Sequence, residues 1–478
     1  MNSDRMEECG PSNTVDGNIV GGNNLDGNKV GGKNVDGNKV GGNNADGNTL
    51  DGNTVDGNKV GGNNVDGHQL DGSTGNSEKR SKPEEQGGQL LPGIPNRITL
   101  EHICTKLPWK AFCILSSVSP TWWQAIHDRS VYNARVQCSS TDTLLVHSHP
   151  FEIDFSCEGL FLYCPREKNC YELPQIPECN RGIPWGCQCI ALDGKIYVLG
   201  GGAGYGDSCE DSDDEEHKKV FKEVYVLDLV GGPESSGCRK WKQCASMQEG
   251  RLKFGCGLIG GKIYAFGGAS HYGPVHGSEV YDPQADTWTT IRPMKTFRFG
   301  HHVATLGEVL VVYGGEVFDQ PQDGVRSKPF LNEDGFRVPS DSVHDAMVME
   351  AYHPVKDEWR QVESFQMHDS EYVFIAGGNF HLITKLGIYV QGVDSKSWKD
   401  LHSNSFPSLQ YHSKFTPHAP VIGNDALYLG VDWSSKYFSG SCLLEGKGFG
   451  SKNLEIVWDE TDCGDAHNYA DLKCGILL

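Results

Sequence analysis

Few residues of this chain have the types and spacing that catalysis or metal binding needs. Glu210 and Asp214 stand four positions apart, a step that suits metal-binding carboxylates, but the next such step falls on Lys218 and His217 comes one position early. A second group combines carboxylate, thiol and imidazole ligands, and it consists of Asp459, Asp462, Cys463, Asp465 and His467. We expect this group to lie in a C-terminal tail, so neither set predicts a metal site.

Nucleophilic and nucleotide-binding patterns do not stand out either. The sequence shows no convincing Ser, His and Asp arrangement, and glycine-rich segments such as residues 200–202 end apolar hairpins instead of opening helices. Seventeen cysteines are present, but no Cys-x-x-Cys pair occurs. Without an export signal, we expect free thiols that serve as small core residues. The sequence therefore predicts no catalytic residue, no metal and no cofactor.

Length and charge limit the remaining classes of function. A chain of 478 residues has room for two to four domains, and its formal net charge of −21 argues against nucleic acid as a partner. The first residues contain no apolar signal core and no run of about 18 apolar residues occurs, so we expect no membrane partner. The protein should act in the cytoplasm, the nucleus or both.

Residues 13–72 form twelve consecutive pentads with Gly at the fifth place and an aliphatic residue or Ala at the third. The period resembles that of pentapeptide-repeat proteins, whose β-solenoid would make three coils here. However, Asn usually stands where that family has a small residue, and one aliphatic group per pentad cannot offset about 1–2 kcal/mol for each ordered residue. We therefore predict that residues 1–88 are a disordered tail that ends in a polar linker.

Residues 94–126 have the pattern of three short amphipathic helices. The first begins near Pro95 and ends at Pro108, and its apolar positions share one face: Ile98, Leu100, Ile103 and Leu107. A second carries Phe112, and Ser119-Pro120 supplies the N-cap and first position of a third. Such a small unit buries too little apolar surface to fold alone. It is either a docking unit or a helical subdomain packed on the rest of the chain.

The order Ile94-Pro95, Leu107-Pro108 and Val118-Ser119-x-x-Trp122 resembles an F-box, which we place at residues 89–136. The resemblance implies docking onto the Skp adaptor of a cullin-RING ubiquitin ligase and, through it, association with the cullin and RING subunits. It assigns docking, and the packing of the F-box itself, to Ile94, Pro95, Ile98, Ile103, Leu107, Pro108, Leu115, Val118 and Trp122. Arg97 departs from the family pattern, because many F-boxes carry an acid there.

From about residue 144 a unit recurs in which an apolar hairpin ends in Gly-Gly and is followed by a Tyr and later a Trp. Residues 192–201 match residues 259–268, and we read further copies as ending at Gly314-Gly315 and Gly377-Gly378. The aromatic pairs that follow are Tyr225/Trp241, Tyr281/Trp288, Tyr352/Trp359 and Tyr389/Trp398. An Asp-Gly or Gly-Gly pair turns a hairpin, and the second Gly pair lets a strand end where backbones crowd together.

This combination resembles the kelch repeat, and the resemblance implies a mainly β fold with a kelch-type β-propeller over residues 137–478. A partial first unit has Cys170 seven residues after Tyr163, where two other copies have Trp, and a degenerate last unit ends near Trp458. The count is then six blades, with five or seven as alternatives. We expect the Tyr and Trp side chains to fill the wedges between blades.

In a four-stranded blade, the loop after the second strand and the segment to the next blade leave on the same face. Two long insertions, residues 202–222 and 316–346, should lie there. The candidates for substrate contact on or just beneath that face are Arg181, Trp185, Arg251, Phe254, Arg298, Phe299 and His301. Arg251 and Arg298 have the alternative role of bridging neighbouring strands. The acidic residues 207–216 form either a solvated loop or a handle for a basic partner, with Ser212 as a candidate phosphorylation site.

The whole arrangement resembles the F-box/kelch-repeat proteins that are abundant in plants. It implies a non-catalytic substrate-recognition subunit of an SCF-type ubiquitin ligase, whose propeller binds the protein to be ubiquitinated. Two alternatives are a kelch scaffold that binds its partner without ubiquitin and, less favoured by the residues above, a metal-dependent kelch enzyme.

Overall fold

The structure is a computed structural model that describes residues 88–150, 157–177, 183–202, 219–232, 239–270, 273–318, 331–332, 335–336, 346–366, 372–384, 387–392, 399–400, 414–417, 420–423, 426–434, 439–447, 457–461 and 472–478. Several sequence predictions lie outside these residues. They concern the pentads, Arg181, the acidic residues 207–216, His217, Trp398 and the residues 462–467. Domain boundaries at residues 88 and 136 stay predictions.

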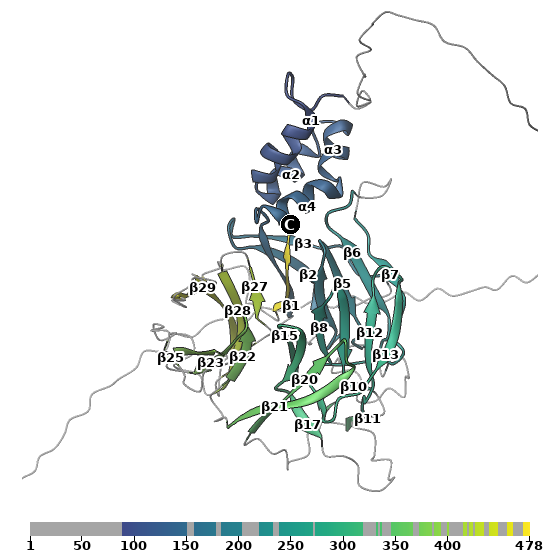
Figure 1. Ribbon diagram of the computed structural model, residues 1–478, viewed down its shortest axis with the longest axis vertical. Coiled ribbons are helices and arrows are strands. Elements are labelled where there is room, and N and C mark those ends of the chain that lie inside the picture. The colour runs from purple at the N-terminus through teal and green to yellow at the C-terminus, as the bar shows by residue number, and fades with distance from the viewer. Residues whose placement is uncertain are drawn as a thin grey trace, which may run out of the picture. The chain divides into compact units, whose positions relative to one another are not determined.

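A short helical unit precedes the strands (Figure 1). The first predicted helix is a run of α1 (Asn96–Ile98), η1 (Thr99–Ile103) and η2 (Cys104–Lys106). It is followed by α2 (Trp109–Leu115), α3 (Pro120–Ile126) and α4 (Arg129–Gln137). The predicted cap is present, because the Ser119 side chain accepts a hydrogen bond from the N–H of Trp122 and Pro120 takes the first helical position. Helix α4 was not predicted, and Asp128 caps it.

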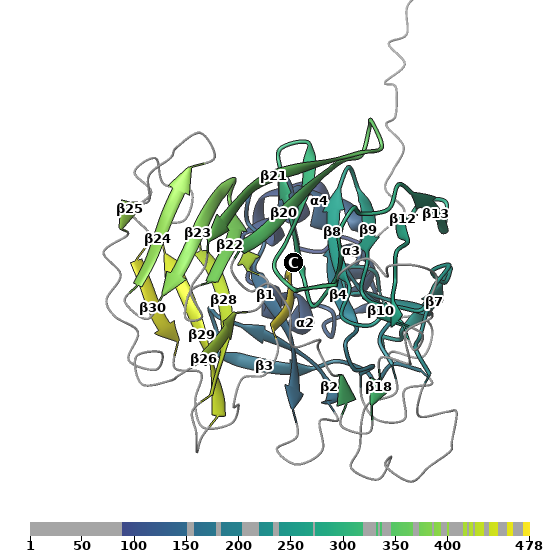
Figure 2. The same ribbon diagram turned by 90° about the horizontal axis from the view of Figure 1, so that it is seen from below.

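Antiparallel sheets with the strand order of propeller blades make up the rest of the described residues. Four of them order their strands as in the chain: β4 (Gln188–Leu192), β5 (Lys195–Leu199), β6 (Val224–Asp228) and β7 (Lys242–Cys244); β8 (Gly255–Ile259), β9 (Lys262–Phe266), β12 (Ser278–Asp282) and β13 (Thr287–Ile291); β15 (His302–Leu306), β16 (Val309–Tyr313), β20 (Ala346–His353) and β21 (Glu358–Gln366); β22 (Tyr372–Ala376), β23 (Asn379–Thr384), β24 (Gly387–Gly392) and β25 (Lys399–Asp400). Figure 2 shows the sheets grouped around a common centre.

A further sheet has five strands: β26 (Lys414–Pro417), β27 (Val421–Ile422), β28 (Ala426–Ser434), β29 (Ser439–Lys447) and β30 (Val457–Thr461). Short two-stranded ribbons accompany the blades: β10 (Ala269–Ser270) with β11 (Gly273–Pro274), β14 (Phe297–Phe299) with β17 (Glu316–Phe318), and β18 (Leu331–Asn332) with β19 (Gly335–Phe336). The mainly β, propeller prediction is confirmed. Five four-stranded blades are present among the described residues, and the five-stranded sheet accounts for the difference from the predicted six.

The remaining four-stranded sheet joins the two ends of the propeller sequence. Strand β31 (Leu472–Leu477) pairs with β1 (Thr143–Pro150), which continues to β2 (Cys157–Cys164) and β3 (Asn169–Glu172). By its place in the sheet order, β31 is the equivalent of β4 and β8. The expectation of a C-terminal tail is wrong at Asp459, which lies in β30, whereas the other four residues of that group lie outside the described residues.

Local turn chemistry explains the hairpins that the sequence predicted. Asp193 and Gly194 have φ values of 57° and 72°, as a two-residue type I′ turn requires. Gly377-Gly378 was assigned wrongly. Ala376 pairs with Asn379 across it, so this pair turns the β22–β23 hairpin and does not follow the second strand, as Gly314-Gly315 does. A Gly-Gly pair can either turn a hairpin or follow the second strand of a blade, and only the strand pairing distinguishes the two cases.

The aromatic pairs whose two members are both described pack between blades, as predicted. Tyr281 and Trp288 face each other across β12 and β13 with ring centroids 5.1 Å apart, and their cluster includes residues of the preceding blade. The Trp288 indole N–H donates to the carbonyl of Ala245, 2.9 Å away, which follows the preceding blade. Tyr163 pairs with Cys170 in the same register, which confirms the degenerate unit.

Candidate protein-interaction sites

The helical unit exposes an unusual amount of apolar surface. Among the described residues, nine large hydrophobic side chains are exposed, and six of them lie in the helical unit, five on its helices and Val118 in the turn between α2 and α3: Ile98 (46%), Ile103 (37%), Ile114 (62%), Val118 (59%), Trp123 (36%) and Val136 (45%). Such concentration on one small element marks an interaction surface, because single exposed hydrophobics are normally scattered.

The unit has little core of its own to cover these side chains. Its buried apolar residues from the first helical turn onward are Cys104, Ile126 and Val131. The helices are seven to nine residues long in α2, α3 and α4, too short to be stable without tertiary packing. Their stability therefore comes from the contacts that they make with the blades, and the opposite face is left open.

The predicted adaptor residues fall into two groups. Ile98, Ile103, Val118 and Pro95 are exposed, whereas the other five are half-buried: Ile94, Leu107, Pro108, Leu115 and Trp122. The sequence reasoning missed Ile114, Trp123 and Val136. Ile114 and Trp123 are adjacent to named positions and could have been found, but Val136 lies on the unpredicted α4. A role in adaptor binding stays a prediction for all of them.

Asp142, just before β1, joins the helices to the closing sheet. Its carboxylate accepts the N–H of Trp109 at 2.5 Å and lies 2.7 Å from the Arg166 guanidinium and 3.4 Å from that of Arg135. The side chains of Asp142 and Arg135 are 4% and 3% exposed. Nearby, the rings of Trp109 and Tyr171 meet edge to face with centroids 5.2 Å apart. The helical unit is thus held by buried polar groups.

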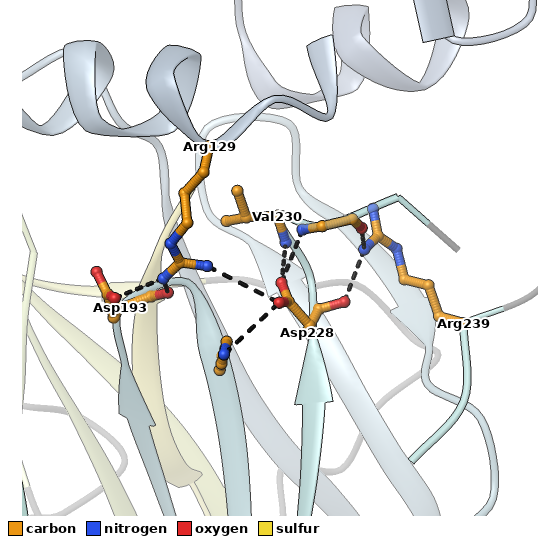
Figure 3. A network of polar contacts seen from close by, with 7 residues as sticks. Arg129, Asp193, Asp228, Val230 and Arg239 are labelled. Atoms are coloured by element: carbon orange, nitrogen blue, oxygen red, sulfur yellow. Dashed lines mark hydrogen bonds and ion pairs between the residues drawn. The ribbon is translucent and has the colours of Figure 1, made fainter. Parts of the chain in front are cut away.

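A second joint connects α4 to the next blade (Figure 3). Arg129 donates to the backbone oxygen and the carboxylate of Asp193 at 2.5 Å, and lies 3.8 Å from the carboxylate of Asp228. The Asp228 carboxylate also accepts the N–H of Val230 at 2.9 Å, while Arg239 donates to the Asp228 carbonyl at 2.7 Å. These contacts occupy the β4–β5 turn and the segment after β6.

The opposite end of the blades carries the other candidate surface. Because neighbouring strands are antiparallel, segments that follow β5, β9 and β16 leave at the end away from the turns that contact the helices. Figure 1 shows β10, β11 and β17 at that end. The predicted insertions leave here, and most of their residues lie outside the described part of the chain. Trp185 is half-buried at this end, with the Lys253 ammonium 4.7 Å from its ring centroid.

Lys253 adopts a strained conformation at this site. Its φ is 45°, and the corresponding residues of the blades on either side, Gly186 and Gly300, have φ values of 65°. The N–H of Lys253 donates to the carbonyl of Gly186 at 2.8 Å, and the N–H of Gly300 donates to the carbonyl of Lys253 at 2.6 Å. A lysine at a left-handed position costs free energy, and such residues cluster at binding sites. Lys253 was not among the residues predicted to contact the substrate.

Most of the candidates for substrate contact are buried, so they lie beneath the face and not on it. Arg251 is 0% exposed and Arg298 1%. Phe254, Phe299 and His301 are 0%, 3% and 3% exposed. Both arginines bridge neighbouring strands, which is the alternative that the sequence left open. Trp185 stays a prediction for direct contact, and Arg181 lies outside the described residues.

Within the described residues no group of three or more His, Cys, Asp or Glu side chains could hold a metal ion. The Cys187 and Cys189 thiols interact with each other, and this contact together with burial raises the pKa of Cys189. No helix in the described part of the chain is long and apolar enough to cross a bilayer.

Known proteins resemble parts of the chain. The kelch motif model matches residues 250–295. An F-box/kelch-repeat protein of Arabidopsis thaliana is 26% identical over 250 residues, which are 46% of this chain and 56% of the relative. Another from the same plant is 25% identical over 366 residues, 74% of this chain and 80% of the relative. Kelch-like protein 26 of Danio rerio is 25% identical over 271 residues, 48% of this chain and 42% of the relative.

The blades, their glycine turns and their Tyr–Trp pairs define a kelch-repeat β-propeller. The similarity to two plant proteins confirms the resemblance to F-box/kelch-repeat proteins that the sequence indicated. The chain spans little more than half the length of the first of these relatives.

Proposed function

We propose that the chain is the substrate-recognition subunit of an SCF-type cullin-RING ubiquitin ligase. In this proposal, the helical unit docks the Skp adaptor and the end of the propeller away from the helices binds the protein to be ubiquitinated. The observation that carries it is the group of six exposed apolar side chains in the helical unit, which the blades anchor from the other side. Binding an adaptor there buries apolar surface without any catalytic residue in this chain.

Trp185 and Lys253 support the second half of the proposal. Aromatic residues are enriched where proteins recognise partners, and this pair lies at the end where long connections leave the blades. A strained lysine over an indole ring provides both apolar area and a charge. We therefore propose this pair as the first contact to test once a target protein is known.

Two exposed valines provide a matched test of adaptor docking. Val118→Glu places a carboxylate on the exposed surface of the helical unit, whereas Val355→Glu does the same on the propeller, where Val355 is 91% exposed. Both changes should leave the free energy of unfolding within about 0.5 kcal/mol. Because a charge in an apolar interface must be desolvated, Val118→Glu should weaken adaptor binding by about ten-fold or more, and Val355→Glu should not.

The measurement is the dissociation constant of the purified chain with a Skp adaptor, for each variant. Equal affinities of the wild type and Val118→Glu would contradict the proposed docking face. If the wild type bound no adaptor but still captured a target through its propeller, the ubiquitin-independent scaffold would replace the proposed function.

A further inference from the structure

The buried guanidinium of Arg135 touches three segments that are far apart in the sequence. It donates to the carbonyl of Leu107 in the helical unit, lies 3.4 Å from the carboxylate of Asp142 and donates to the carbonyl of Leu478 at 3.0 Å. Its flat face also lies over the Phe112 ring, 4.7 Å from the centroid. Leu478 follows β31, so one side chain of α4 contacts both the adaptor-binding unit and the strand that closes the ring of blades.

Asp142 completes this arrangement from the other side. Its backbone N–H donates to the carbonyl of Leu478 at 2.7 Å, and the N–H of Leu478 donates back at 3.0 Å. Its carboxylate accepts the N–H of Trp109. Leu107 and Trp109 flank Pro108, so both ends of this predicted adaptor-contact segment are held by groups that also hold Leu478.

Guanidinium is a donor only, and a buried charged donor that loses an acceptor is strongly destabilised. If β31 leaves the sheet, Arg135 loses the Leu478 carbonyl and Asp142 loses both backbone hydrogen bonds to Leu478. The Leu107–Trp109 segment is then held by an incomplete set of partners. Its conformation therefore depends on a strand that it does not itself contain.

We propose that Arg135 and Asp142 are positioning residues that couple closure of the propeller by β31 to the shape of the adaptor-binding segment at Leu107–Trp109. This inference rests on the proposed adaptor function. Its consequence is that a chain whose ring of blades is open presents a distorted helical face. Only a closed propeller, with its recognition end complete, is then loaded efficiently onto the ligase.

A glycine in β31 allows the strand to be displaced without touching the helices. A Cβ atom at Gly475 would lie 2.0 Å from a methyl carbon of Val421 in β27. Gly475→Val must therefore push β31 away from β27. Gly159→Ala in β2 of the same sheet is the matched control, because its Cβ would meet its first neighbour at 4.0 Å. Arg135→Met removes the coupling group and leaves β31 unchanged.

Adaptor affinity of the full chain is measured for the wild type, Arg135→Met, Gly475→Val and the double variant. Because each single change removes a hydrogen bond to a charged group, it should weaken adaptor binding by roughly ten-fold or more. The double variant should be little weaker than either single one, because both remove the same coupling. Arg135→Lys, which keeps donors and charge, should recover part of the affinity. Independent, multiplicative effects would overturn the inference.

Hydrogen exchange in the chain without adaptor separates this inference from the proposed function. Gly475→Val should speed exchange of the Trp109 amide and leave the amides of β8 and β9 as in the wild type. Unchanged exchange at Trp109 with β31 displaced, or equally faster exchange in β8 and β9, would overturn the coupling. If the wild type binds no adaptor but Gly475→Val still speeds exchange of the Trp109 amide, the proposed function fails and the structural coupling stands.

Discussion

The guanidinium of Arg251 lies 2.6 Å from the carboxylate of Glu279, and both side chains are closed to solvent. The same guanidinium donates to the carbonyls of Gly267 at 2.9 Å and Gly277 at 2.7 Å. Its own backbone carbonyl accepts the N–H of Gly201 from the preceding blade at 2.8 Å. Arg251 therefore ties two blades together, and this explains why an arginine recurs at the entry to a blade.

Arg251→Met should lower the free energy of unfolding by about 3–5 kcal/mol, because it leaves the carboxylate of Glu279 buried without its partner. Arg292→Met is the control. Arg292 is 62% exposed and lies 3.9 Å from the carboxylate of Asp357, so its loss should cost less than about 1 kcal/mol. Urea unfolding of both variants gives the two changes in the free energy of unfolding. Similar losses would contradict a stabilising role for the buried pair of Arg251 and Glu279.

Ser139 follows the last turn of α4 with φ 48°, and the N–H of Ser140 donates to the carbonyl of Arg135 at 2.9 Å. This is the helix end that glycine favours, so Ser139→Gly should raise the free energy of unfolding by about 1 kcal/mol. Ser116, the C-cap of α2, has φ −62°. There the change to Gly should lower stability by about 0.5 kcal/mol. Thermal melting of both variants tests the opposite signs.

His381 makes the stability of the chain depend on pH. It is fully buried, and burial lowers the pKa of its imidazole to about 4, although a backbone hydrogen bond to Ala376 acts in the other direction. The unfolded chain takes up this proton near pH 6.5, so stability is lost as the pH falls from about 6.5 towards 4. At pH 4.5 the loss should be about 2–3 kcal/mol relative to pH 7.

His381→Phe removes this titration and keeps a ring against Phe374, which lies 4.9 Å from the imidazole centroid. Urea unfolding at pH 7 and pH 4.5 should therefore show a smaller difference in the variant. Burial also lowers the pKa of His301, so His301 contributes to the difference that remains. An unchanged pH dependence in His381→Phe would exclude His381 as a source.

Gly194 and Gly261 both turn hairpins, but only Gly194 lies against the helices. Gly194 and Gly261 have φ values of 72° and 71°, but a Cβ at Gly194 would lie 2.2 Å from Val230 and 3.3 Å from Tyr132, whereas Gly261 has open space. Both Ala variants carry the same backbone strain. Gly194→Ala should cost about 1–3 kcal/mol more, because it overpacks the joint with α4. Equal melting temperatures would argue against that joint.

Local patterns predicted the parts of the fold that depend on neighbouring residues. The turn at Asp193-Gly194 and the N-cap at Ser119 follow from backbone conformations that these residue types favour. The pair Gly377-Gly378 shows the limit, because both a hairpin and a strand end suit two glycines. Strand β31 could not be found in this way, since its partner β1 is more than 300 positions earlier in the sequence.

The candidate sites were less predictable than the blades. Arg251 and Arg298 have the chemistry of recognition residues, and only their distant acceptors, Glu279 and the Gly314 carbonyl among them, show that they are buried. Three exposed positions of the helical unit were named from the sequence: Ile98 and Ile103 through amphipathic spacing, which is local, and Val118 through the resemblance to an F-box. Val136 was missed together with its helix, whose apolar spacing is weak.

Closure by β31 also has a consequence for biosynthesis. Arg135 and Leu478 are 343 positions apart, so β1 to β3 emerge from the ribosome long before the strand that covers the edge of β1. During translation that edge is open to pairing with other chains, which is a route to aggregation. The nascent chain should therefore depend on chaperones until β31 has left the ribosome.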